Sequence, residues 1–176
     1  MTAKIWTLLV FLAFGGCASR TAPEAQAPSA PPAPPASEPT RAAQRTATAS
    51  TLAVERQWLA AWFKGTPVVI AQRPDGAVVV EVPREFCFEA GQEVVKPALA
   101  AVLDKVAGSM RRTAIAELHL IAAPGDQGGA AALGMRRATR VYDFLRARGL
   151  PAGRLARPSA TSGTAVQLRI EAASPA

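Results

Sequence analysis

The chain has 176 residues, of which 49% are hydrophobic, so it is long enough and apolar enough to bury one core. Its 15 prolines are unevenly distributed, which favours one compact domain with appended segments over a fully folded chain. The formal net charge of +7 would usually suggest nucleic acid, but the first residues indicate export and exclude chromosomal DNA and RNA, which leaves anionic envelope polymers, lipid headgroups or simple solubility as explanations.

The first segment, residues 1–16, has the layout of a secretory signal. One cation, Lys4, precedes an apolar run, and two glycines stand directly before Cys17. The apolar run is too short to span a bilayer comfortably. The segment therefore predicts export of everything that follows it.

A cysteine directly after small residues resembles the lipobox of bacterial lipoproteins, although Phe14 stands where that family usually has leucine. The resemblance implies that residues 1–16 are a lipoprotein signal peptide and that Cys17 becomes an amino terminus acylated with palmitate-type chains. Each buried acyl methylene contributes about 0.8 kcal/mol, so several chains make release from the lipid negligible. Ala18 and Ser19 offer no acidic signal for inner-membrane retention, which points to the outer membrane. The alternatives are an ordinary signal peptide cut further on and an uncleaved anchor.

Residues 17–49 are dominated by Ala, Pro, Ser and Thr and lack large apolar side chains, so we expect the acylated cysteine to be followed by a disordered tether. Residues 50–65 then predict an amphipathic helix capped by Ser50 or Thr51. Trp58 and Trp62 share one face of it, and core packing is favoured over carbohydrate or partner binding.

The remaining chain, 66–173, predicts one domain of the α/β class, an α+β sandwich. Two β-branched runs at 68–72 and 77–82 flank a Pro-Asp-Gly turn and predict a hairpin. The other elements expected are a helix beginning at Pro97, a strand at 116–122 with Leu118 and Leu120 on one side, a helix from Leu133, and an alternating strand at 164–172. This β-α-β-α-β order favours helices packed on one face of a small mixed sheet.

Three segments of this domain together resemble the carboxy-terminal, peptidoglycan-associating domain of outer-membrane protein A (OmpA). The stretch Phe86-Cys-Phe-Glu-Ala-Gly91, with Lys96-Pro97, is similar to the family's entry into its first helix. The more specific match is the segment from Leu133 to Leu155, through its Arg137-Ala138 pair and its apolar spacing. The resemblance covers roughly residues 66–172 and implies the OmpA-like fold.

In that family an aspartate and the arginine of the Arg-Ala pair hold the diaminopimelate of the peptidoglycan stem peptide. The resemblance implies that Arg137 binds a carboxylate and that Asp126 accepts an ammonium. The loop of Asp126 departs from the family, because it is shorter and lacks Gly-His-Thr; alanines at 130–132 replace an asparagine, and Gly134 stands where serine is usual.

Two interpretations follow from these matches and departures. In the first, the protein is a lipid-anchored outer-membrane lipoprotein that faces the periplasm and binds peptidoglycan through Arg137 and Asp126. In the second, the wall site is degenerate and the domain is an interaction module for envelope proteins. The corresponding readings of the two residues are a solvated helix arginine and a turn or capping aspartate.

We expect no catalysis, cofactor or metal. His119 is the one histidine, predicted to be a buried or hydrogen-bonded strand residue, and Cys87 lies between two phenylalanines, where a thiolate is disfavoured. With Cys17 acylated, Cys87 has no disulfide partner and should be a buried apolar thiol. The partners expected are peptidoglycan, outer-membrane lipid through Cys17, and envelope proteins, with no nucleic acid.

Overall fold

The computed structural model describes residues 38–126 and 131–173. The expected signal peptide, Cys17 and the first part of the expected tether lie outside these residues. The long helices are α1 (Glu38–Trp62), α3 (Pro97–Arg112) and α4 (Ala131–Ala147), with the short α2 (Arg84–Cys87) and the 3-10 turn η1 (Ala152–Arg154) between other elements. The strands are β1 (Val69–Gln72), β2 (Val78–Pro83), β3 (Ala116–Pro124), β4 (Pro158–Thr161) and β5 (Ala165–Ala172).

The five strands form one mixed sheet in the order β1-β2-β5-β3-β4, in which only β3 and β4 run parallel. The predicted hairpin is confirmed: β1 pairs with β2, and an Asp75 carboxylate oxygen accepts the amide of Ala77 at 3.0 Å within the turn. The strand β4 was not predicted, because four half-buried residues that begin with Pro158 show no alternation.

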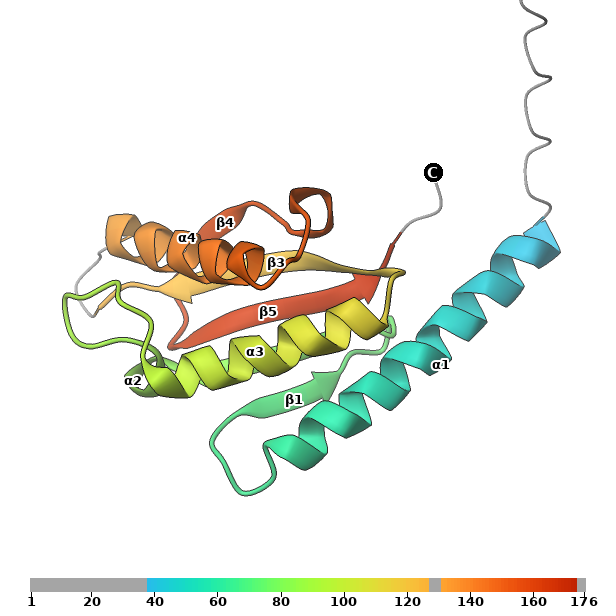
Figure 1. Ribbon diagram of the computed structural model, residues 1–176, viewed down its shortest axis with the longest axis horizontal. Coiled ribbons are helices and arrows are strands. Elements are labelled where there is room, and N and C mark those ends of the chain that lie inside the picture. The colour runs from blue at the N-terminus through green and yellow to red at the C-terminus, as the bar shows by residue number, and fades with distance from the viewer. Residues whose placement is uncertain (1–37, 127–130, 174–176) are drawn as a thin grey trace, which may run out of the picture. The chain divides into compact units, whose positions relative to one another are not determined.

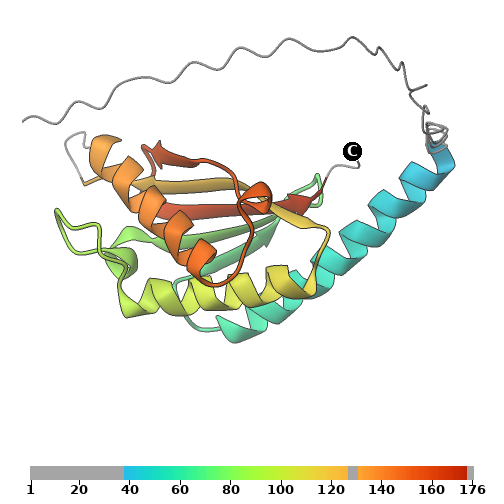
Figure 2. The same ribbon diagram turned by 45° about the horizontal axis from the view of Figure 1, so that its top comes forward.

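Helices α1, α3 and α4 lie on the same face of the sheet (Figures 1 and 2), which confirms the predicted architecture. The core lies between them and the strands. Its fully buried members include Leu99 and Leu103 of α3 and Leu145 of α4, opposite Val80 of β2 and Ile121 of β3. Pro97 begins α3 as expected, where its missing amide hydrogen costs nothing.

A β-bulge at His119 changes which residues of β3 face the core. The register against β5 shifts between Leu118 and Leu120, so that Leu120 pairs with Arg169 on the open face of the sheet. Leu118 is buried together with Ile121, while Leu120 is half-buried. The expectation that Leu118 and Leu120 share one side is therefore wrong, because the extra residue of the bulge reverses the alternation beyond it.

Helix α1 begins at Glu38, much earlier than residue 50. Ser50 and Thr51 do not cap it: their hydroxyls donate to the carbonyls of Thr46 and Ala47, each at 3.0 Å, inside the helix. The prediction of a tether as far as residue 49 is wrong for residues 38–49. This alanine-rich stretch has high helix propensity and extends a helix that its carboxy-terminal half has already nucleated by packing on the domain.

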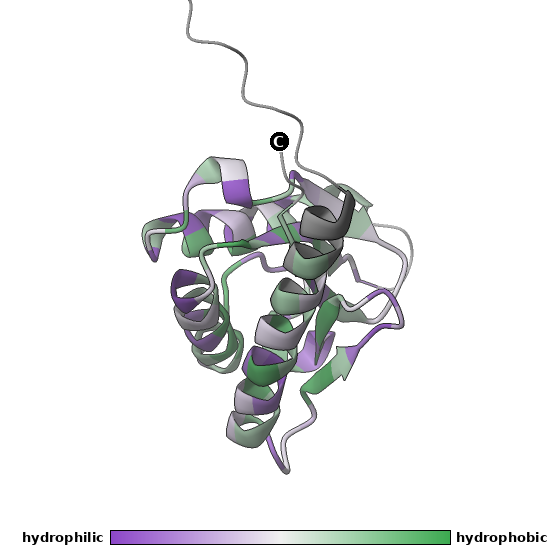
Figure 3. Cartoon of the chain, turned by 90° about the vertical axis from the view of Figure 1, so that its right-hand side faces the viewer, coloured by the Kyte–Doolittle hydropathy of each residue, from purple (hydrophilic) through white to green (hydrophobic). Residues whose placement is uncertain are grey.

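The carboxy-terminal half of α1 packs beside α3. Leu52 and Leu59 are buried, and Glu55 accepts hydrogen bonds at 2.7 Å from both Ser109 and Arg112 of α3. Hydrophobic and hydrophilic residues alternate along this helix (Figure 3). The core contacts of α1 are thus made by its leucines.

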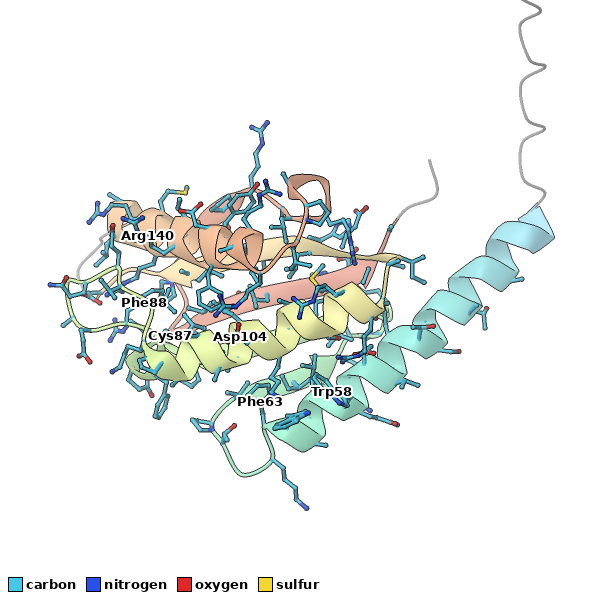
Figure 4. All side chains as sticks on the ribbon, viewed as in Figure 1. Trp58, Phe63, Cys87, Phe88, Asp104 and Arg140 are labelled. Atoms are coloured by element: carbon cyan, nitrogen blue, oxygen red, sulfur yellow. The ribbon has the colours of Figure 1, made fainter. Side chains whose placement is uncertain are left out.

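The tryptophans of α1 contact cations of α3 at the edge of this packing. Trp62 is 55% exposed and carries the Lys105 ammonium 3.3 Å from its ring centroid, while the guanidinium of Arg112 lies 4.0 Å from the ring centroid of Trp58. Trp58 points from α1 towards α3 (Figure 4). Core packing was predicted for this pair, and the structure places it at the rim instead. In the described parts of the chain, no helix has both the length and the apolar character needed to cross a membrane.

Candidate functional site

The two residues predicted to bind a ligand meet at one end of the domain. Asp126 lies two residues beyond Pro124, the last residue of β3, and Arg137 lies in the second turn of α4. An Nη1 atom of Arg137 lies 2.9 Å from Oδ1 of Asp126. The shortened loop between β3 and α4 therefore still brings the carboxylate to the guanidinium.

The guanidinium of Arg137 is fully buried, with a side-chain exposure of 0%. Its nitrogens donate to three backbone carbonyl oxygens, those of Gln92 (2.8 Å), Glu89 (3.0 Å) and Pro124 (3.0 Å). The ring of Phe88 stacks near it, with the centroid 5.0 Å from Cζ. The alternative reading of a solvated helix arginine is wrong, because the hydrophobic neighbours and the carbonyls enclose the charge completely.

The same contacts limit what Arg137 offers a ligand. A guanidinium has five N–H groups, and the three carbonyls together with Asp126 accept four of them. In this arrangement Arg137 holds the 88–92 loop and the end of β3 together. Its predicted role as a carboxylate clamp stays a prediction, since one N–H group is left over and a bidentate contact with a carboxylate needs two.

Asp126 is partly accessible, with 28% of its side chain exposed. Its Oδ2 accepts the amide hydrogen of Gly91 at 2.6 Å, and Gly91 has a φ of 70°, a conformation that favours glycine. The amide of Gly91, followed by the Arg137 guanidinium, holds the pKa of Asp126 below its ordinary value of 3.8. The carboxylate is therefore charged at neutral pH, and the glycine of the Phe-x-Phe-x-x-Gly stretch positions it.

A second basic residue at the site was missed by sequence reasoning. Arg84, the first residue of α2, donates from Nη1 to the carbonyl of Gly125 at 3.3 Å, and the same atom lies 3.8 Å from Oδ1 of Asp126. Its side chain is 32% exposed. The only signal in the sequence was its position two residues before Phe86, and Arg84 itself belongs to no motif.

Surface arginines of α4 fix the 88–96 loop from outside. Glu93 accepts hydrogen bonds from Arg136 at 2.8 Å and from Arg140 at 2.6 Å. The hydrogen bond from Arg140, the largest effect, lowers the pKa of Glu93 against the opposing effect of burial, and Arg136 lowers it further. In Figure 4, Arg140 lies on α4 at the same end of the domain as Phe88. Part of the basic face of α4 is thus neutralised by the loop that borders the site.

Gly134, where the family usually has serine, sits in a close contact. A Cβ built there would lie 2.8 Å from the carbonyl oxygen of Ala123 and 3.1 Å from both the amide nitrogen of Gly125 and the Cβ of Ala160. Helix α4 therefore approaches β3 and β4 more closely than a residue with a side chain would permit. Glycine in place of the family's serine thus allows α4 to pack closely against residues 123–125, directly before Asp126.

Cys87 and His119 lie in different environments. Cys87 is buried in the core, and burial, the largest effect, raises the pKa of its thiol to about 12. His119 is 39% exposed on the open face of the sheet, 3.5 Å from Glu117 and 3.8 Å from Glu171. Of the two expected environments, buried or hydrogen-bonded, the buried one is therefore wrong. Within 38–126 and 131–173, no three His, Cys, Asp or Glu residues are grouped as a metal site would need.

Comparison with solved structures identifies the architecture. A MotB-like protein from Desulfovibrio vulgaris matches with a TM-score of 0.56 and 14% identity, over 75% of this chain and 98% of its own. The periplasmic domain of Helicobacter pylori MotB (residues 90–256) matches with a TM-score of 0.53 and 14% identity, over 63% and 83%. The chain has an OmpA-like fold.

The assignment of the fold rests on the two MotB matches and not on sequence relatives. The OmpA-like domain of FopA1 from Francisella tularensis is also similar, with a TM-score of 0.43 and 13% identity, over 62% of this chain and 82% of its own. No family model and no curated protein matches the sequence. In this OmpA-like fold, the ends of β2 and β3 and the start of α4 converge on Arg84, Asp126 and Arg137.

Proposed function

We propose that this chain is an envelope protein whose OmpA-like domain binds peptidoglycan non-covalently, through the diaminopimelate of the stem peptide. In this proposal Cys17 is acylated, the chain is anchored in the outer membrane, and the domain faces the periplasm, where it links membrane and wall. The observation that carries the proposal is the contact of 2.9 Å between Asp126 and Arg137, the two residues that the OmpA resemblance assigns to ligand binding.

The chemistry of the site supports a ligand that is both cationic and anionic. Asp126 is charged and 28% exposed, so one of its oxygens can accept an ammonium in addition to its protein donors. Guanidinium groups beside it supply the complementary donors for a carboxylate. Diaminopimelate carries both kinds of group at its free end.

The fold supports the compartment. MotB periplasmic domains are among the structures that this chain resembles, and a periplasmic domain is what an exported, tethered module would require. The proposed anchor rests on the lipobox-like residues before Cys17. The role proposed is binding, and the site residues are given no catalytic task.

One observation favours a second function. Arg137 is fully buried and its guanidinium contacts four acceptors within the protein. The predicted wall site could therefore serve only to hold the 88–92 loop and the end of β3 together. The domain would then be an interaction module in an envelope assembly. The two functions differ in whether Asp126 has an external ligand.

Sedimentation with purified sacculi tests the proposal. Full-length protein in mild detergent should co-sediment with sacculi, and Asp126→Ala should release most of it to the supernatant. The matched control is Asp143→Ala, which removes an exposed acid of α4 and the same charge. If wild type stays in the supernatant, wall binding is wrong and the interaction module is favoured. If Asp126→Ala sediments as fully as wild type and Asp143→Ala, wall binding through this site is wrong.

A further inference from the structure

Arg84 has the exposure that Arg137 lacks. Its side chain is 32% exposed against 0% for Arg137, although both guanidinium groups lie within 4 Å of the same Asp126 oxygen. The one hydrogen bond that its side chain makes among the described residues runs from Nη1 to the carbonyl of Gly125. Nε and Nη2 of Arg84 have no acceptor in the part of the chain that the structure describes, so donors remain for a ligand.

The charges around Asp126 leave an excess of cation. Arg84 and Arg137 share the single carboxylate of Asp126, while the nearby Glu89 is paired with Lys96 at 2.8 Å. Arg137 is closer to Asp126 than Arg84 is, at 2.9 Å against 3.8 Å, so Arg84 carries most of the unbalanced charge. An anionic group bound beside Asp126 would balance it.

We infer that Arg84 binds the carboxylate of the ligand at this site and that Arg137 is a positioning residue. This inference rests on the proposed peptidoglycan function. A guanidinium can take a carboxylate bidentately through Nε and Nη2, and those are the two atoms of Arg84 that remain free of described partners. Arg137 orients Asp126 and the 88–92 loop, so that the ammonium and the carboxylate of one ligand find their partners on neighbouring residues.

The test pairs a change in the protein with a change in the ligand. Full-length protein in detergent is titrated with two soluble stem peptides, one with free diaminopimelate and one whose distal diaminopimelate carboxyl is amidated. Wild type should bind the amidated peptide about tenfold more weakly than the free acid, the effect of one partly exposed charge-assisted contact. Arg84→Ala should bind the free acid about tenfold more weakly than wild type, and should not distinguish the two peptides.

Further variants separate a direct contact from a general effect of charge or folding. Arg73→Ala removes an exposed arginine of the β1–β2 turn and should bind like wild type. Arg84→Lys keeps the charge but not the bidentate geometry and should lie between wild type and Arg84→Ala. Thermal unfolding of each variant identifies any loss of binding that comes from misfolding.

The outcomes distinguish this inference from the function on which it rests. If wild type binds neither peptide, the proposed function fails. If wild type binds and Arg84→Ala still prefers the free acid, the carboxylate is bound elsewhere and the inference is wrong. The inference is equally wrong if folded Arg84→Ala loses both peptides to the same extent, because Arg84 would then act on something other than the carboxylate.

Discussion

Arg137 and Asp126 form an ion pair, 2.9 Å long, in which the arginine is fully buried and the aspartate is partly exposed. The pair also connects three segments that are distant in sequence, because the guanidinium donates to carbonyls at residues 89, 92 and 124. The buried partner therefore supports the backbone, and the exposed partner is available for binding.

Replacing Arg137 by alanine should lower the free energy of unfolding by about 3 kcal/mol, since it leaves Asp126 without its guanidinium partner and three carbonyls without a donor. Denaturant titration measures this loss. The neighbouring Arg136 is the control: its side chain is 57% exposed and pairs with Glu93. Arg136→Ala should lower the free energy of unfolding by less than about 1 kcal/mol. Equal effects of the two changes would contradict the structural role of Arg137.

The lowered pKa of Asp126 predicts a pH dependence. Its folded-state pKa lies below 3.8, so its contribution to stability is fully present above that value and is lost as the pH falls through the folded-state pKa. The difference in stability between wild type and Asp126→Asn should therefore stay constant from pH 7 to about 5 and shrink in more acidic solution. Urea titrations across this range measure it, and the effect of Glu93 cancels in the comparison. A stability difference that grows as the pH falls would contradict the lowered pKa of Asp126.

Cys17 should decide the membrane placement. If it is acylated, Cys17→Ser should move the protein from the membrane fraction to the soluble fraction and abolish labelling by a fatty-acid probe, because the acyl chains supply the affinity for lipid. Cys87→Ser, which changes the other cysteine, is the control and should remain in the membrane and keep the label. Membrane association that survives Cys17→Ser would favour an uncleaved anchor.

Cys87 should be chemically silent in the folded protein. A pKa of about 12 in place of 9.0 leaves about a thousandfold less thiolate, and the sulfur is also enclosed. In Cys17→Ser, which leaves Cys87 as the single thiol, maleimide labelling at pH 8 should be slower by at least about a hundredfold than in denaturant. Labelling of native protein at the denatured rate would mean that α2 opens readily.

The sequence predicted those helices and strands that bury one face, because burial requires apolar residues at a regular spacing. Helix α3 begins at Pro97, and β5 alternates as expected, because each buries one face against the same core. The bulge at His119 could not be predicted from the sequence. Leu118 and Leu120 are two residues apart and would share one face of a regular strand, and only the pairing with β5 shows that an extra residue separates them. Residues 38–49 were misjudged because composition does not reveal a neighbouring helix that extends into them.

The sequence identified two residues of the site, but it did not show what each of them does. Asp126 and Arg137 were found from their motif, yet burial separates their roles, and burial depends on where the 88–92 loop passes. Arg84 is the first residue of α2, directly after the end of β2, and is brought to the site only by the order of strands in the sheet. Its role is set by distance across the fold, which spacing along the chain does not encode.

Gly134 provides the sharpest test of how the shortened loop is accommodated. Gly134→Ala should lower the free energy of unfolding by about 1–3 kcal/mol, because the new Cβ would lie 2.8 Å from the carbonyl oxygen of Ala123, a backbone atom that cannot rotate away. The matched control is Gly153→Ala, where a Cβ meets nothing within 4 Å, so the change should stay within about 0.5 kcal/mol.

Gly134→Ser, which restores the family's usual residue, should be at least as costly as Gly134→Ala, since both carry the same Cβ. Because α4 also carries Arg137, a helix pushed away from β3 would lengthen the contact with Asp126, and sedimentation with sacculi should weaken together with stability. Full stability of Gly134→Ser would show that α4 can withdraw without cost. The close approach of α4 to β3 would then be incidental to the geometry of the site.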